Sequence, residues 1–150
     1  MPSLSKETPL GPVTLVEEND AIVRLEWDNG GADETELLVE AHRQLAAYFA
    51  GELTEFDLPL APAVSPTQQR FLDALTAIPF GETKTYGQIA KETGMSAQGA
   101  GQACGANPIA IIIPCHRILG ADNLGGFSAA GGVEAKVALL KHEGSASLLI

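Results

Sequence analysis

The chain has 150 residues and a formal net charge of −10 at neutral pH, and 45% of its residues are hydrophobic. A chain of this length and apolar content can bury the core of one domain or of two small ones. It contains no apolar run long enough to cross a bilayer, and it does not start with a charged, apolar and small-residue signal pattern. We therefore predict a soluble, cytoplasmic protein with no membrane partner.

The negative charge is unevenly distributed. Residues 1–60 hold thirteen acidic and three basic side chains, and residues 61–150 hold six of each, so the first part carries the whole net charge. Attraction to phosphate supplies most non-specific affinity for nucleic acid, which makes an acidic chain a poor general nucleic-acid binder. The neutral second part can still bind DNA locally.

Cysteine and histidine are too sparse for a structural framework. The two cysteines, Cys104 and Cys115, do not make a disulfide scaffold. The three histidines, His42, His116 and His142, are scattered singly and lack the spacing of zinc ligands. We predict no metal and no dissociable cofactor.

The first part of the chain reads as strands followed by a helix. Alternating apolar residues predict a β-hairpin of residues 12–17 and 21–27, joined by a turn at 18–20. An amphipathic helix of about residues 33–50 follows, and Gly51 ends it. These elements predict a small sheet with one helix packed on it.

A proline-stiffened segment at residues 58–62 reads as a linker. It coincides with the change in charge, and it predicts a domain boundary near residue 60. We therefore predict an N-terminal α/β domain with its linker in residues 1–60, followed by a mainly helical domain in residues 61–150. The overall fold class is α/β.

The second part opens with clear helix starts. Ser65 is a predicted N-cap, with Pro66 at the first helical position and Gln68 completing a capping box. Thr85 and Gln88 predict a second capping box.

The second box begins a short helix of residues 86–93 that ends at Gly94, and Ser96 caps the next helix, which runs to about Gly105. Two short helices joined by a tight turn have the shape of a helix-turn-helix, here of the winged-helix-like kind. An ordinary helical hairpin is the alternative.

Cys115 carries the chemical interest of the sequence. It follows the apolar run 109–113, where burial would normally raise the pKa of a thiol and make it inert. The adjacent His116 could make it a nucleophile if a carboxylate orients the imidazole. The simpler interpretation is that Cys115 is a small buried hydrophobe, the usual fate of a free cysteine.

Two further segments lie downstream of this cysteine. The glycine-rich residues 124–132 favour a close approach of the backbone to a ligand or, equally, a surface loop. A last helix of residues 133–143 is predicted to turn Val133, Val137 and Leu140 inward. Its final residue, Glu143, either reaches a histidine elsewhere in the fold or is solvated.

The segment Pro114-Cys115-His116-Arg117, with Asn107-Pro108 eight residues before the cysteine, resembles the signature of the O6-alkylguanine-DNA alkyltransferases, also called methylated-DNA–protein-cysteine methyltransferases. Other segments follow the pattern of the same family, namely residues 8–15, 78–83, 85–90, 126–128, 131–132, Lys136 and 139–144. The resemblance therefore covers essentially the whole chain. It implies DNA repair by direct transfer of the alkyl group from O6-alkylguanine, with O4-alkylthymine as a further candidate substrate, to the protein's own cysteine without turnover.

The resemblance also implies a role for each matching residue. Cys115 would accept the alkyl group, His116 would take the thiol proton through a water, and Glu143 would orient the imidazole. Asn107 would brace the turn before the site. The Tyr86 hydroxyl would donate a proton or a hydrogen bond to the purine as guanine leaves.

The residues that the resemblance places at the DNA or the substrate are Gln98, Arg117, Ile118, Phe127, Ser128 and Lys136. Arg117 would hold the site by ion pairs, and backbone groups at Cys115, Ile118 and Ser128 would read the edge of the guanine. The implied partner is alkylated DNA, entered from the minor groove by a monomer that flips the target guanine out of the duplex.

One position departs from the family pattern. Gln98 stands where the family has an intercalating arginine, and no basic residue lies between Lys91 and Arg117. The helix of residues 96–105 thus carries no charge, although its small side chains suit close packing in a minor groove. Phe127 stands where many relatives have tyrosine, a milder difference.

Two other classes of protein remain as alternatives. A relative that binds alkylated DNA without transfer would lack the cysteine, so Cys115 argues against that class. A cysteine hydrolase or redox thiol protein unrelated to DNA would turn over or regenerate its cysteine.

Overall fold

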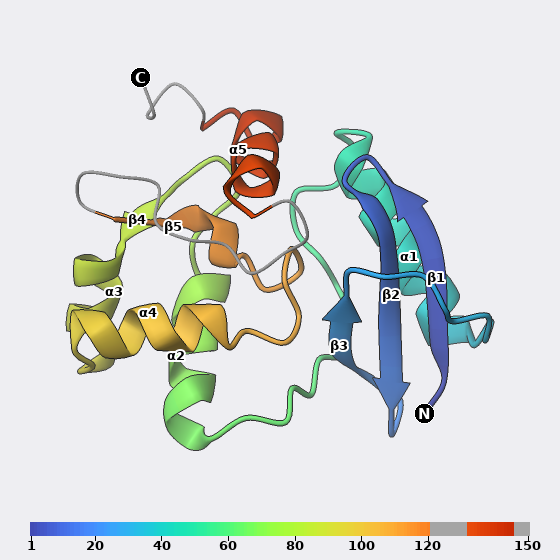
Figure 1. The fold of residues 1–150 in the computed structure, drawn as a ribbon, viewed down its shortest axis with the longest axis horizontal. Helices are drawn as coiled ribbons and strands as arrows, with labels where there is room; N and C mark the ends of the chain where they lie inside the picture. Colours follow the sequence, from blue (N-terminus) through green and yellow to red (C-terminus); the bar gives the residue numbers. More distant parts are fainter. Residues whose placement is uncertain (121–131, 146–150) are drawn as a thin grey trace. The chain divides into compact units, whose positions relative to one another are not determined.

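The structure is a computed structural model that describes residues 1–120 and 132–145 of the chain (Figure 1). It divides into two compact units, Met1–Ala63 and Val64–Ile150. Among the described residues, no helix combines the length and the apolar character that crossing a membrane requires.

The first unit is a three-stranded antiparallel sheet in the order β1-β2-β3, formed by Ser3–Thr8, Gly11–Glu18 and Ala21–Glu26. The predicted hairpin is confirmed as β2 and β3, and both turn residues, Asn19 and Asp20, have the positive φ angles that a tight hairpin turn requires. Strand β1 was not predicted from the sequence. It buries Leu4 but is otherwise largely polar, so it lacks an apolar alternation.

Helix α1, Glu36–Phe49, packs against all three strands. The predicted helix is confirmed, but it begins later than residue 33 because the Thr35 side chain caps it by accepting from the Leu38 N–H at 3.1 Å. Gly51, with a φ of 78°, lies just beyond its end.

The segment predicted as a linker is in part paired with the sheet. The Ile22 N–H donates to the Pro59 carbonyl at 2.8 Å, and the Ala61 N–H donates to the Ile22 carbonyl at 2.9 Å. Residues 59–61 therefore pair with β3 at the edge of the sheet.

The second unit is mainly helical. Helix α2, Pro66–Thr76, starts at Ser65 as predicted, and the Ser65 side chain accepts from the Gln68 N–H. The predicted reciprocal half of this capping box is wrong, because the Gln68 amide instead donates to the Ala103 carbonyl at 2.7 Å. That bond ties α2 to the end of α4, Ala97–Gly105.

Helices α3, Tyr86–Thr93, and α4 form the predicted pair of short helices, and they pack on each other and on α2 (Figure 1). The capping box of Thr85 and Gln88 is present, and Gly94 ends α3 in the left-handed conformation. Helix α4 turns Ala100, Ala103 and Cys104 inward.

The chain then leads into the 3₁₀ turn η1, Cys115–Arg117, and the strand β5, Ile118–Leu119, which pairs in parallel with β4, Lys84–Thr85. Helix α5, Val133–His142, contacts η1. Its inward face differs from the prediction, because Val133 is exposed and Val137 is half-buried. Lys136, Leu139 and Leu140 point inward. The prediction counted only apolar residues toward the buried face of the helix, so it missed a face that includes a lysine.

The first unit offers a matched test of packing at two neighbouring glycines. A Cβ at Gly31 would lie 2.6 Å from the Ser3 carbonyl carbon, whereas a Cβ at Gly30 would meet no atom within 4 Å. Gly31→Ala should lower the free energy of unfolding by about 1–3 kcal/mol, the usual effect of overpacking. Urea denaturation of both alanine variants checks this, and equal losses in the two would contradict it.

Candidate active site

The candidate site is the buried turn η1 together with the segments that hold it, all in the second unit. Cys115 is 1% exposed, His116 0% and Arg117 6%. The turn is preceded by residues 108–113, which form turns and not a strand. Ile109 and Ile111 in that segment are buried, so the cysteine lies at the end of an apolar layer.

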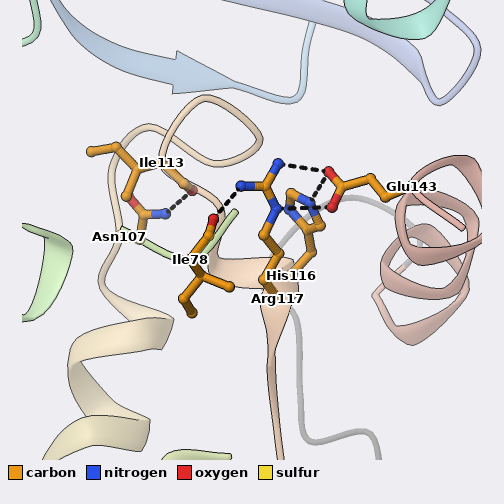
Figure 2. Close-up of polar contacts among 6 residues, drawn as sticks. All are labelled: Ile78, Asn107, Ile113, His116, Arg117 and Glu143. Carbon is orange, nitrogen blue, oxygen red and sulfur yellow. Dashed lines mark hydrogen bonds and ion pairs between the residues drawn. The ribbon is translucent and has the colours of Figure 1, made fainter. Parts of the chain in front are cut away.

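Asn107 fixes the shape of this approach, as Figure 2 shows. Its side-chain amide donates to the Ile113 carbonyl at 3.0 Å, and its side-chain oxygen accepts from the Ile109 N–H at 3.0 Å. One buried side chain therefore joins both ends of the loop between α4 and η1.

The loop that Asn107 braces is strained at its centre. Ile111 has a φ of 70°, a left-handed conformation that a β-branched residue rarely adopts. The Ile112 N–H donates to the Ala110 carbonyl at 2.8 Å across this residue. Such a conformation costs on the order of 1–3 kcal/mol and persists only where surrounding contacts enforce it.

The Glu143 carboxylate joins two residues of η1 (Figure 2). The His116 Nε2–H donates to Glu143 Oε2 at 2.7 Å. Arg117 donates from Nε to Oε1 at 2.8 Å and from Nη2 to Oε2 at 3.0 Å. Glu143 lies at the C-cap of α5, and both of its side-chain partners are buried.

Arg117 is held from two further sides. Its Nη1 donates to the Ile78 carbonyl at 2.7 Å, and its guanidinium carbon lies 5.9 Å from the centre of the Phe80 ring. Both Ile78 and Phe80 come from the segment after α2, whose residues 78–83 follow the family pattern.

Burial keeps His116 neutral. Desolvation lowers the pKa of His116, and the hydrogen bond to Glu143 opposes that effect without overcoming it. Because Nε2 holds the proton given to Glu143, Nδ1 is a lone-pair acceptor, and it is a buried atom with no hydrogen-bond partner among the residues that the structure describes. The imidazole is therefore oriented by a carboxylate and ready to accept a proton at Nδ1.

Cys115 does not stand alone. The Cys104 thiol donates to the Cys115 carbonyl at 3.8 Å, and the two thiols interact with each other. The hydrogen bond with Cys104 and then burial raise the pKa of Cys115 well above its usual value. No local pattern predicts this neighbour, since Cys104 lies eleven residues earlier, on α4.

Tyr86, the first residue of α3, reaches the Cys104 thiol. A hydrogen bond with the Tyr86 side chain is among the causes that lower the pKa of Cys104, after the hydrogen bond with Cys115. Tyr86 is half-buried.

Lys136, which the resemblance places at the DNA or the substrate, lies in the interior of the second unit. It is fully buried, and its Nζ donates to the Ile118 carbonyl at 2.6 Å.

The remaining predicted residues lie apart from this cluster or outside the described part. Gln98 is exposed on α4. Phe127 and Ser128 lie outside the described residues. Within residues 1–120 and 132–145, no group of three or more histidine, cysteine or acidic side chains could hold a metal ion.

The lowered pKa of His116 predicts a pH-dependent stability. Below its ordinary pKa of 6.5, the unfolded chain protonates this imidazole while the folded chain resists, so the free energy of unfolding falls as the pH falls. His42, whose pKa burial also lowers, acts in the same direction. Denaturation at about pH 7.5 and about pH 5.5 should show a smaller loss for His116→Gln and for His42→Gln than for the wild type. Greater stability in acid would contradict this.

Comparison with known proteins adds the family. Residues 66–145 match the model of the DNA-binding domain of 6-O-methylguanine DNA methyltransferase, and residues 5–62 match the model of its ribonuclease-like domain. A methylated-DNA–protein-cysteine methyltransferase of Methanosarcina acetivorans is 42% identical, with 93% of this chain and 96% of the relative covered. A constitutive enzyme of the same name from Bacillus subtilis is 38% identical, with 91% and 92% covered.

The structural likeness agrees. The crystal structure of Mycobacterium tuberculosis OGT in complex with DNA superposes with a TM-score of 0.87 at 40% identity, covering 97% of this chain and 94% of that one. Both family models, the curated relatives and this structure point to one assignment. The chain belongs to the O6-methylguanine DNA methyltransferase family.

Proposed function

We propose that this chain repairs DNA by moving the alkyl group of O6-alkylguanine onto its own Cys115, once per molecule. The relatives are named for methyl transfer from DNA to a protein cysteine, and the family model covers the segment that holds Cys115. The observation that carries the proposal is the buried His116, bonded to Glu143 through Nε2 and with Nδ1 left to accept a proton.

The transfer is a displacement at the alkyl carbon. The Cys115 thiol proton moves to His116 Nδ1 through a water, and the sulfur then forms a bond to the alkyl carbon. The bond from that carbon to O6 of the guanine breaks, and its electron pair stays on the base. Glu143 stabilises the imidazolium that forms, as in other arrangements of nucleophile, base and orienting group.

The neighbouring residues position the reactants. Tyr86 donates a proton or a hydrogen bond to the purine. This donation stabilises the negative charge that the purine holds after the bond between O6 and the alkyl carbon breaks. Asn107 holds the approach to Cys115 in shape, and Arg117 fixes Glu143 by two hydrogen bonds. The thioether that results is stable, so no second step frees the cysteine.

The pair of helices α3 and α4 binds the DNA. A base inside a duplex cannot reach a buried thiol, so the target guanine must be flipped out of the stack. We propose that α4 does this from the minor groove and that one copy of the chain suffices, since every site residue comes from a single unit. The relative from Mycobacterium tuberculosis was crystallised with DNA.

In this proposal, Gln98 determines how strongly α4 binds the DNA duplex. It is exposed on α4, where the family pattern has an arginine. Glutamine can hydrogen-bond the base left unpaired, but it brings no charge between the phosphates. Unstacking a base costs on the order of a few kcal/mol, and a wedge residue offsets part of that cost.

The mechanism predicts where the alkyl group lands. After exposure to an O6-methylguanine oligonucleotide, the whole-protein mass should rise by one methyl group, and Cys115→Ser should abolish the gain. Cys104→Ser should still take the group on Cys115. His116→Gln and Glu143→Gln should slow transfer roughly 10²–10⁴-fold, the usual value of general-base help. Methylation of Cys104, or repeated turnover as in a hydrolase, would disprove the mechanism.

The place of Gln98 predicts a difference between two substrates. Gln98→Arg should speed the repair of duplex DNA but barely change the reaction with free O6-benzylguanine, which needs no flipping. Its DNA binding should also weaken more steeply with salt, because one more cation meets the phosphates.

Measuring both substrates in both proteins is the test, and the free base serves as the internal control. Equal acceleration of the two reactions, or of neither, would mean that Gln98 is not the wedge residue.

A further inference from the structure

Cys104 is a thiol to which the proposed transfer gives no role. It lies in the last turn of α4, on the buried face of that helix. Both Cys104 and Cys115 are free cysteines, and Cys104 is 6% exposed where Cys115 is 1% exposed. The candidate site therefore holds a second reducing sulfur beside the proposed alkyl acceptor.

Hydrogen bonds through Asn107 connect the backbones of the two cysteines. The Asn107 N–H donates to the Cys104 carbonyl at 3.2 Å. The Asn107 side-chain amide donates to the Ile113 carbonyl at 3.0 Å, and the Cys115 N–H donates to that same carbonyl at 2.8 Å. The two cysteines are eleven positions apart in the chain, yet one asparagine holds them together.

The end of α4 is also held from the other side. The Gln68 amide of α2 donates at 2.7 Å to the carbonyl of Ala103, the residue just before Cys104. The last turn of α4 is thus bonded both to α2 and to the loop that leads to Cys115. These contacts keep Cys104 in place beside Cys115.

The Cys104 sulfur itself contacts Cys115. Its Sγ lies 3.8 Å from the Cys115 carbonyl oxygen, to which the thiol donates. The two thiols also hydrogen-bond each other, and this bond is the largest cause of the lowered pKa of Cys104 and of the raised pKa of Cys115. Cys104 is therefore the thiol that ionises first, and the thiolate is the form that oxidants attack.

We propose that Cys104 and Cys115 form a reversible oxidation site, in which a small hydroperoxide joins the two sulfurs in an intramolecular disulfide. The Cys104 thiolate attacks the peroxide, the O–O bond breaks, and Cys104 becomes a sulfenic acid. The hydroxide that leaves takes up the proton that Cys104 had released. The Cys115 sulfur then displaces the oxygen from Cys104, and that oxygen leaves as water with the Cys115 thiol proton. Two electrons pass from the thiols to the hydroperoxide.

The burial of the pair selects the size of the oxidant. Hydrogen peroxide is close to water in size, whereas a disulfide between two peptides cannot bring its sulfur to either buried thiol while the fold is intact. A sulfenic acid beside a second thiol stops at the disulfide, which a reductant reverses. The disulfide occupies the Cys115 sulfur and blocks alkyl transfer until it is reduced, a consequence that rests on the proposed function.

Two proteins that differ at one sulfur test the site. The reduced full chain and its Cys104→Ser variant are treated with graded amounts of hydrogen peroxide, and catalase ends each reaction. The remaining thiols are labelled with iodoacetamide in denaturant. Trypsin, which cuts after Lys91 and Arg117, then releases residues 92–117 as one peptide with both cysteines for mass spectrometry. Benzyl transfer from free O6-benzylguanine is measured before and after dithiothreitol.

Oxidation should leave the wild-type peptide lighter by two hydrogen atoms and without label. Benzyl transfer should fall in step with this change, and dithiothreitol should restore it. Cys104→Ser should lose activity roughly tenfold more slowly, since each unit of higher pKa lowers the thiolate fraction about tenfold. The Cys115 that does react in this variant should gain oxygen and pass to sulfinic acid, which dithiothreitol does not reverse.

Oxygen added to the wild-type peptide without the loss of two hydrogen atoms would overturn the inference. Inactivation of Cys104→Ser as fast and as reversibly as the wild type would overturn it too. If Cys104→Ser does not fold, Cys104→Ala replaces it, and the wild-type peptide decides by itself. Should the reduced wild type take no benzyl group, the proposed function fails, while the peptide mass still decides whether the two cysteines form the disulfide.

Discussion

The Glu143 carboxylate, buried at the end of α5 and shared by His116 and Arg117, is the interaction on which the candidate site depends. A buried carboxylate is costly unless its charge is matched and its oxygens are bonded, and here Arg117 supplies the charge and three hydrogen bonds use both oxygens. Since Arg117 is also bonded to the Ile78 carbonyl, the same contact joins α5, η1 and the segment after α2.

The charge states of the groups in the candidate site are linked to this contact. With Glu143 matched by Arg117, His116 keeps an orienting bond yet stays neutral, because desolvation lowers its pKa. The thiol beside it is neutral for a related reason, as the Cys104 hydrogen bond and burial raise the pKa of Cys115. In the proposed transfer, this neutral pair of thiol and imidazole becomes charged only when the thiol proton moves.

The helix that we propose faces the DNA carries no charge. Helix α4 has small residues, an exposed Gln98 and no ionised side chain. The first unit holds the whole net charge of −10, so attraction to phosphate must come from the six basic residues of the second unit, and two of these, Arg117 and Lys136, are buried. If α4 enters the groove as proposed, close packing there contributes more to DNA binding than charge does.

Local signals in the sequence predicted most of the helical elements. The caps at Ser65, Thr85 and Ser96, and the glycine that ends α3, act within one helical turn, so they can be read without the fold. The hairpin of β2 and β3 was predicted because its apolar alternation and its turn are also local patterns. Strand β1 was missed, because a largely polar edge strand has no periodic pattern and forms only when the sheet is there to pair with it.

The sequence by itself determined the family and pointed to Cys115, His116 and Arg117 as candidate site residues, since the three are adjacent and their family signature is local. Tertiary structure alone decided their surroundings. Gln68 bonds Ala103 in place of its own cap, Cys104 faces Cys115, and Lys136 turns into the buried face of α5. The physical reason is that burial and long-range partners set the pKa of a side chain and its direction, and neither can be read from the spacing of residues along the chain.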